Sequence, residues 1–123
     1  MLLSTSELLG LKTLEVPYTI GYAIEPMVAG SILKAARIVV DELREEILLG
    51  LPVAQISVER LDDYDAGQWS ELVFLITVDL SRQEANERWD KLIDRLADLA
   101  ESQTDESLRT ALSEDISVQF RWY

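Results

Sequence analysis

Residues 53–80 read VAQISVERLDDYDAGQWSELVFLITVDL, and this stretch predicts a β-hairpin. Its first part alternates apolar and polar residues, as in a strand with one face on a core and the other in water. A polar loop with Gly67 follows, and the second part again alternates. The apolar residues on one face of the second part are Leu72, Phe74, Ile76, Val78 and Leu80. Because Val73 and Leu75 make the opposite face apolar too, we expect this strand at the centre of a sheet, or with its outer face against a partner.

The end of the chain predicts another strand, because the segment ISVQFRW also alternates. Its apolar residues are Ile116, Val118, Phe120 and Trp122. We expect these four side chains under helices, in the core.

An earlier segment, residues 14–24, carries apolar residues of one parity. These are Leu14, Val16, Tyr18, Ile20, Tyr22 and Ile24. They predict a first strand, but Pro17 lacks the N–H that a central strand donates. The first strand should therefore lie at an edge near Pro17, or break there.

Two long helices separate these strands. The first is expected from Pro26 to about Leu49, where Gly50 and Pro52 end it. Its first half is apolar nearly all round, so it must be covered by the sheet, by the N-terminal segment or by a second copy of the chain.

The second long helix begins with Ser81 and Glu84, the S-x-x-E spacing of a capping box. Apolar residues then recur at helical spacing, and charged residues occupy the other face. The residues expected on the solvent side are Glu84, Arg88, Lys91, Asp94, Arg95 and Asp98. A short helical segment around Leu108 should precede the last strand.

The order strand, helix, strand, strand, helix, strand resembles the ferredoxin-like βαββαβ architecture. We therefore expect one α+β domain over residues 1–123, with an antiparallel sheet and two helices on one face. In that topology the first and third strands are central and the other two are edges. Pro17 conflicts with a central first strand, so a three-stranded antiparallel sheet with two main helices and a separate N-terminal segment is the competing interpretation.

Composition removes several kinds of chemistry. The 123 residues include no cysteine and no histidine, which excludes disulfides, thiolate and imidazole metal sites, and Ser-His-Asp catalysis. We expect no catalytic residues, no cofactor and no metal. The fragment Asp63–Gly67 resembles part of a calcium loop, but positions six and twelve are Gln68 and Phe74 where glycine and glutamate are required.

Charge points to the kind of partner. The chain has 23 acidic and 11 basic residues, a net charge of −12. Such a surface disfavours direct binding to nucleic acid or to anionic membranes. Because no apolar run approaches the roughly 20 residues that span a bilayer, we expect a cytoplasmic protein. The acidity favours a basic protein partner, or serves solubility alone.

Two surfaces are candidates for binding such a partner. In the expected topology, the loop between strands two and three and the segment before the last strand lie at the same end of the sheet, which Glu25 should join. The acidic candidate residues there are Glu59, Asp62, Asp63, Asp65, Glu71, Asp105 and Glu106. The second surface is the outer sheet face at Val73 and Leu75, which could also form a homodimer.

These observations favour a non-catalytic acidic protein-binding module, such as a regulator, an inhibitor or an assembly factor. One alternative is an acidic mimic of nucleic acid that occupies a basic groove, which steep salt dependence and competition by DNA would reveal. Another is a small-molecule-sensing or enzymatic ferredoxin-like domain. A pocket with convergent polar groups would distinguish this last alternative.

Overall fold

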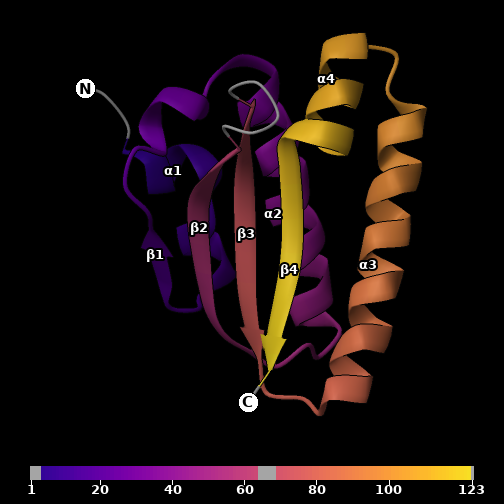
Figure 1. Cartoon of the computed structure of the whole chain (residues 1–123). Coiled ribbons are helices and arrows are strands. Elements are labelled where there is room, and N and C mark those ends of the chain that lie inside the picture. The colour runs from indigo at the N-terminus through magenta and orange to yellow at the C-terminus, as the bar shows by residue number, and fades with distance from the viewer. Residues whose placement is uncertain (1–3, 64–68, 123) are drawn as a thin grey trace.

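The computed structural model describes residues 4–63 and 69–122, which contain a four-stranded mixed sheet (Figure 1). Its strands are β1 (Tyr18–Ile20), β2 (Val53–Asp63), β3 (Trp69–Val78) and β4 (Ile116–Trp122). Their order across the sheet is β1-β2-β3-β4. The β2–β3 pair is the predicted antiparallel hairpin, whereas β1 is parallel to β2 and β3 is parallel to β4.

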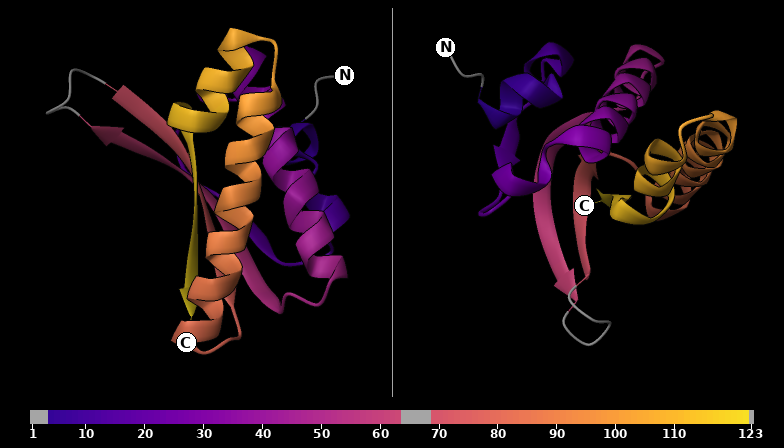
Figure 2. Two further views of the ribbon diagram at one scale, coloured as in Figure 1. Left: turned by 90° about the vertical axis from the view of Figure 1, so that its right-hand side faces the viewer. Right: turned by 90° about the horizontal axis from the view of Figure 1, so that it is seen from above.

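The helices lie on one face of this sheet (Figure 2). The two long ones are α2 (Gly30–Leu48) and α3 (Arg82–Ser102). The short ones are α1 (Thr5–Leu9), α4 (Glu106–Thr110), the 3₁₀ turns Leu11–Leu14 and Glu25–Met27, and the π turn Ala111–Asp115. Within residues 4–63 and 69–122, none of the helices combines the length and the apolar character that crossing a bilayer requires.

The α+β class is as expected, but the sheet differs from the antiparallel ferredoxin-like one. Helix α2 connects the neighbouring parallel strands β1 and β2, and α3 with α4 connects β3 and β4 in the same way. The chain therefore forms two βαβ units joined by a hairpin. This places β1 at an edge and β2 at the centre, the reverse of the expected positions, while β3 is central and β4 is an edge as predicted.

The first strand is much shorter than its pattern suggested. Strand β1 holds only three residues, and the backbone is left-handed on either side of it, at Glu15 (φ 58°) and Ala23 (φ 62°). Pro17 just precedes the strand and still accepts a hydrogen bond from the Ile56 N–H at 3.0 Å. Its missing donor costs nothing at an edge, which explains why proline is tolerated there. Tyr22 shares the parity of the strand but is exposed.

The core lies between the helices and the inner face of the sheet. On β3, Leu72, Phe74 and Ile76 are fully buried. The buried residues of α2 are Ala35, Ala36, Val39, Val40, Leu43 and Glu46. Helix α2 contacts α1, the turn Leu11–Leu14, α4, the π turn Ala111–Asp115 and β4. Trp122 is 40% exposed, against the core position expected, because it is the last residue of an edge strand.

Helix α3 begins where the capping box predicted. The Ser81 Oγ accepts a hydrogen bond from the Glu84 N–H at 3.2 Å. The expectation that Arg88 and Arg95 face solvent is wrong, because both form ion pairs with Glu46 of α2. That carboxylate is only 4% exposed, so the two arginines turn towards the α2–α3 interface to neutralise it.

Candidate functional site

The acidic residues predicted at one end of the sheet are partly brought together. Strand β2 ends there, β3 and β4 begin there, and α4 lies beside the start of β4 (Figure 1). Burial raises the pKa of Asp115, and the neighbouring carboxylates of Glu114 and Glu71 raise it further. Residues of the hairpin and of the segment before β4 are therefore close enough to repel each other. We call Glu71, Glu106, Glu114 and Asp115 the acidic end.

Two candidate residues of β2 have their own contacts within the hairpin. The Asp62 carboxylate accepts hydrogen bonds from the Arg60 Nε at 2.8 Å and from the Ser70 hydroxyl at 2.6 Å. The Glu59 carboxylate accepts one from the Ser57 hydroxyl at 2.9 Å. The Asp62 carboxylate therefore links β2 to β3, whereas the Glu59 carboxylate contacts a residue of its own strand. The hairpin bends away from the helices in Figure 2.

Of the two candidate residues at the start of α4, Asp105 has a structural role and Glu106 is exposed. Asp105 is the N-cap of α4, and its carboxylate accepts hydrogen bonds from the Ser107 and Leu108 N–H groups at 2.9 and 3.4 Å. Glu106 is exposed in the first turn. It lines a hollow with Asp115, at the end of the sheet where α2 begins. Glu106 is thus available to a partner, whereas Asp105 stabilises the helix.

Part of the predicted loop lies outside the described residues. This applies to Asp65 and to most of the fragment that resembles a calcium loop. Asp63 is described only as the last residue of β2. In the described ranges, no group of three or more acidic side chains is placed to hold a metal ion.

Val73 and Leu75 lie on the sheet face opposite the helices, but they do not form an exposed apolar patch. They are 6% and 8% exposed. Val73 pairs with Glu59 and Ser117 on the neighbouring strands, and Leu75 pairs with Ser57 and Gln119. Side chains of neighbouring strands on the same face lie close enough to shield each other. A hollow remains on this face, and Leu61 beside it is 52% exposed.

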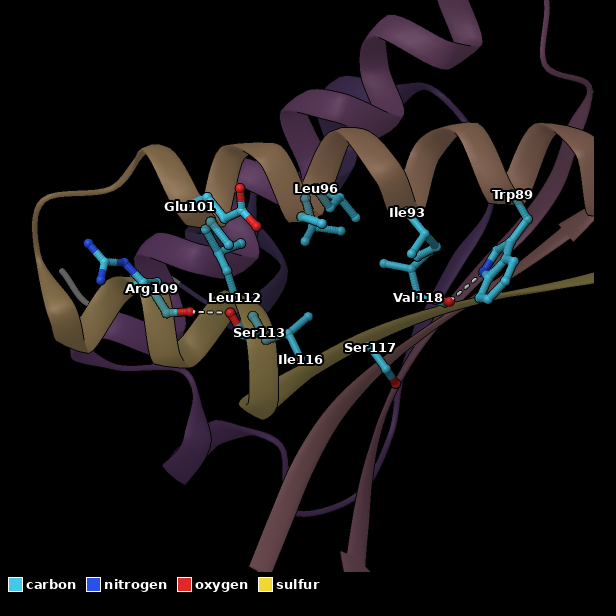
Figure 3. A pocket seen from close by; sticks show the side chains of 13 residues that line it. Trp89, Ile93, Leu96, Glu101, Arg109, Leu112, Ser113, Ile116, Ser117 and Val118 are labelled. Carbon is cyan, nitrogen blue, oxygen red and sulfur yellow. Dashed lines mark hydrogen bonds between the residues drawn. The ribbon is translucent and has the colours of Figure 1, made fainter.

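A pocket between α3, the π turn and β4 was not predicted from the sequence (Figure 3). Its volume is about 390 Å³. The lining is mainly apolar: Val39, Trp89, Ile93, Leu96, Ala97, Ala100, Leu112, Ile116 and Val118. The Trp89 Nε1–H donates to the Val118 carbonyl at 2.7 Å, which ties the two walls together at one end. We call this the α3–β4 pocket.

The polar residues of the α3–β4 pocket do not converge on its interior. The Arg109 guanidinium donates to the Gln103 carbonyl at 2.6 Å, and the Ser113 hydroxyl donates to the Arg109 carbonyl at 2.7 Å. The Ser117 hydroxyl points away from the cavity in Figure 3, and the Glu101 carboxylate lies at the rim. This arrangement suits an apolar group and offers no set of groups for a reaction.

One signal in the sequence bears on this pocket. Ala97 and Ala100 are small residues on the side of α3 that faces β4, and they leave space that a leucine would fill. Because alanine also favours helix formation, these two residues alone do not indicate a pocket.

No protein-family model, no curated protein and no solved structure matches this chain.

Asp115 allows a test of the charge repulsion at the acidic end. An Asp115→Asn variant should be more stable than the wild type near pH 7, by less than about 1 kcal/mol, because it removes a charge that is disfavoured by burial and by the neighbouring carboxylates. Since the pKa of Asp115 is raised in the folded protein, its contribution to stability is present at low pH and lost as the pH rises through that pKa. The gain should therefore vanish below about pH 4.

Urea denaturation at both pH values measures this difference. Asp79→Asn is the matched control, because Asp79 is exposed at the opposite end of the sheet. It should leave the free energy of unfolding unchanged. An Asp115→Asn variant that is no more stable than the wild type near pH 7 would contradict an unfavourable charge at Asp115.

Proposed function

We propose that this chain is a non-catalytic, acidic protein-binding module whose partner presents a basic surface. The observation that carries the proposal is the crowding of Glu71, Glu114 and Asp115: the pKa of Asp115 is raised first by burial and then by the two neighbouring carboxylates. A cationic group of a partner placed there would relieve this repulsion and favour ionised Asp115. Complementary charge would also raise the rate of association.

Two arginines, Arg60 of β2 and Arg109 of α4, are engaged in hydrogen bonds within the chain. Arg60 donates to Asp62 and to the Ala23 carbonyl, the latter at 3.2 Å. Arg109 donates to the Gln103 carbonyl. Neither guanidinium forms an ion pair with Glu71, Glu114 or Asp115 within residues 4–63 and 69–122, so a cationic group of a partner can approach these carboxylates.

The test is a comparison of two double variants as immobilised baits. Glu71→Gln with Glu114→Gln removes two charges from the acidic end. Glu45→Gln with Glu87→Gln removes two exposed charges at the opposite end, where α2 ends and α3 begins. Extract of the source organism is passed over each bait and over the wild type, and bound proteins are eluted in salt steps and identified by mass spectrometry.

We expect a basic protein that the wild type and the opposite-end variant retain, and that the acidic-end variant loses at several-fold lower salt. A partner retained equally by both variants would show that the acidic end is not the binding surface. Competition of that partner by DNA would favour a nucleic-acid mimic instead.

A further inference from the structure

The α3–β4 pocket lies beside a row of exposed acidic residues on α3. Asp90, Asp94 and Glu101 are exposed, and their spacing of four and seven residues places them along one side of the helix. Ala97 is exposed between them and lines the pocket. An apolar cavity and a line of carboxylates therefore adjoin one another at Ala97. We call these three residues the α3 acidic row.

The dimensions of the pocket limit what can occupy it. Ligand pockets of proteins span about 300–1,000 Å³, so a cavity of about 390 Å³ is near the lower end of that range. Small-molecule sites orient their ligands with polar groups that point inwards. Here the hydroxyl groups of Ser113 and Ser117 and the Arg109 guanidinium are directed elsewhere. Glu101 is the remaining polar residue of the lining and is exposed, so the interior of the cavity suits an apolar group.

The pocket has walls that are fixed in the free protein. The hydrogen bond from Trp89 to the Val118 carbonyl joins α3 to β4. Leu96 and Ile116, which line opposite walls, are themselves mostly buried in the core. An apolar group that enters this preformed site loses water without requiring the core to rearrange, which favours affinity.

We propose that the α3–β4 pocket receives one bulky apolar side chain of a basic partner segment, whose lysines or arginines lie along the α3 acidic row. This inference rests on the proposed function, because it specifies the chemistry of the same basic partner. The apolar side chain provides the buried anchor that interfaces typically require, and the charges select the segment around it.

Three synthetic pentapeptides, each labelled with fluorescein and blocked at both ends, test the proposal by fluorescence anisotropy. Their sequences are KKFKK, KKAKK and EEFEE. Burying a phenylalanine contributes about 1.5–3 kcal/mol, so KKFKK should bind about 10-fold or more tighter than KKAKK. EEFEE should show no binding at the same concentrations, because the α3 acidic row repels it. Equal affinities for KKFKK and KKAKK, or binding of EEFEE as tight as that of KKFKK, would overturn the proposal.

Two variants test whether the tighter binding of KKFKK depends on the pocket. Ala97→Trp places a large side chain at the pocket mouth and should reduce the affinity for KKFKK to that for KKAKK. Gln83→Trp adds the same bulk to an exposed position in the first turn of α3 and should change neither affinity. A preference for KKFKK that persists in a folded Ala97→Trp variant, as judged by circular dichroism, would also overturn the proposal.

The charge variants separate this proposal from the proposed function. Asp94→Asn with Glu101→Gln should lower the affinities for KKFKK and KKAKK by the same factor, so that the ratio of the two affinities is unchanged. A changed ratio would contradict separate roles for the cavity and the charges. The Glu71→Gln with Glu114→Gln variant tests the acidic end on the captured partner. One outcome is that the captured partner binds the Glu71→Gln with Glu114→Gln variant as well as the wild type, while KKFKK still binds tighter than KKAKK. The proposed function is then wrong, and the pocket remains an anchor site. If the preference is absent, the pocket proposal fails alone.

Discussion

Replacing Phe74 with alanine is expected to lower the free energy of unfolding by about 3–5 kcal/mol. Phe74 is fully buried and lies in the middle of β3, between the central partner β2 and the edge strand β4. Its ring is the largest of the fully buried side chains of the described residues. Removing it takes away apolar contacts and leaves a cavity that a paired central strand can close only in part. Urea denaturation followed by circular dichroism measures the loss.

Two further variants calibrate this result. Phe74→Leu keeps most of the buried volume and should cost less than half as much. Leu61→Ala changes a half-exposed side chain of β2 and should stay within about 0.5 kcal/mol of the wild type. If Phe74→Ala unfolds at equilibrium, Phe74→Leu still reports on the site. A loss below about 1 kcal/mol in a folded Phe74→Ala variant would show that Phe74 is not a central core residue.

The elements that local patterns determine were predicted well. The β2–β3 hairpin follows from alternation around a polar loop, and α3 starts at the Ser81 cap where the S-x-x-E spacing places it. Ile116, Val118 and Phe120 are buried as their alternation indicated. Each of these signals depends on residues a few positions apart, which is the range over which strand and helix periodicity is expressed.

The order of the strands was predicted wrongly for β1 and β2, because it depends on contacts between distant segments. A strand, a helix and a strand have the same pattern whether the two strands become neighbours or leave a gap for a third. Pro17 was the one local indication of the true arrangement, since it favours an edge position for β1. The length of β1 was overestimated because residues 14–24 keep their parity through turns whose backbone leaves the strand conformation at Glu15 and Ala23.

The candidate site, like the fold, was predicted only in part. The sequence indicated that acidic residues gather at one end of the sheet, and Glu71 and Asp115 do approach there. It did not indicate that Asp105 caps α4, nor that α3 and β4 enclose a pocket. Asp105 is followed three residues later by Leu108 and not by Glu or Gln, so it lacks the capping-box spacing that marked Ser81. A cavity depends on how two elements pack, which local spacing does not show.

The second large effect is expected at the α2–α3 interface. Glu46 is buried on α2 and is paired with Arg88, at 3.2 Å, and with Arg95, both on α3. Arg95 Nε also lies 3.3 Å from Glu42 Oε2, an ion pair without hydrogen-bond geometry. Replacing both arginines with methionine should cost about 3–5 kcal/mol near pH 7, because it leaves a buried carboxylate without its cations.

A third substitution distinguishes the buried charge from lost packing. Adding Glu46→Leu to Arg88→Met and Arg95→Met removes the uncompensated carboxylate and leaves apolar side chains of similar size between the helices. This triple variant should recover most of the lost free energy of unfolding, because replacing a complete buried ion-pair network with apolar residues is often neutral or stabilising. Urea denaturation of both variants beside the wild type decides the point. If the triple variant is as unstable as the double one, packing of the arginine side chains, and not neutralisation of Glu46, holds α3 against α2.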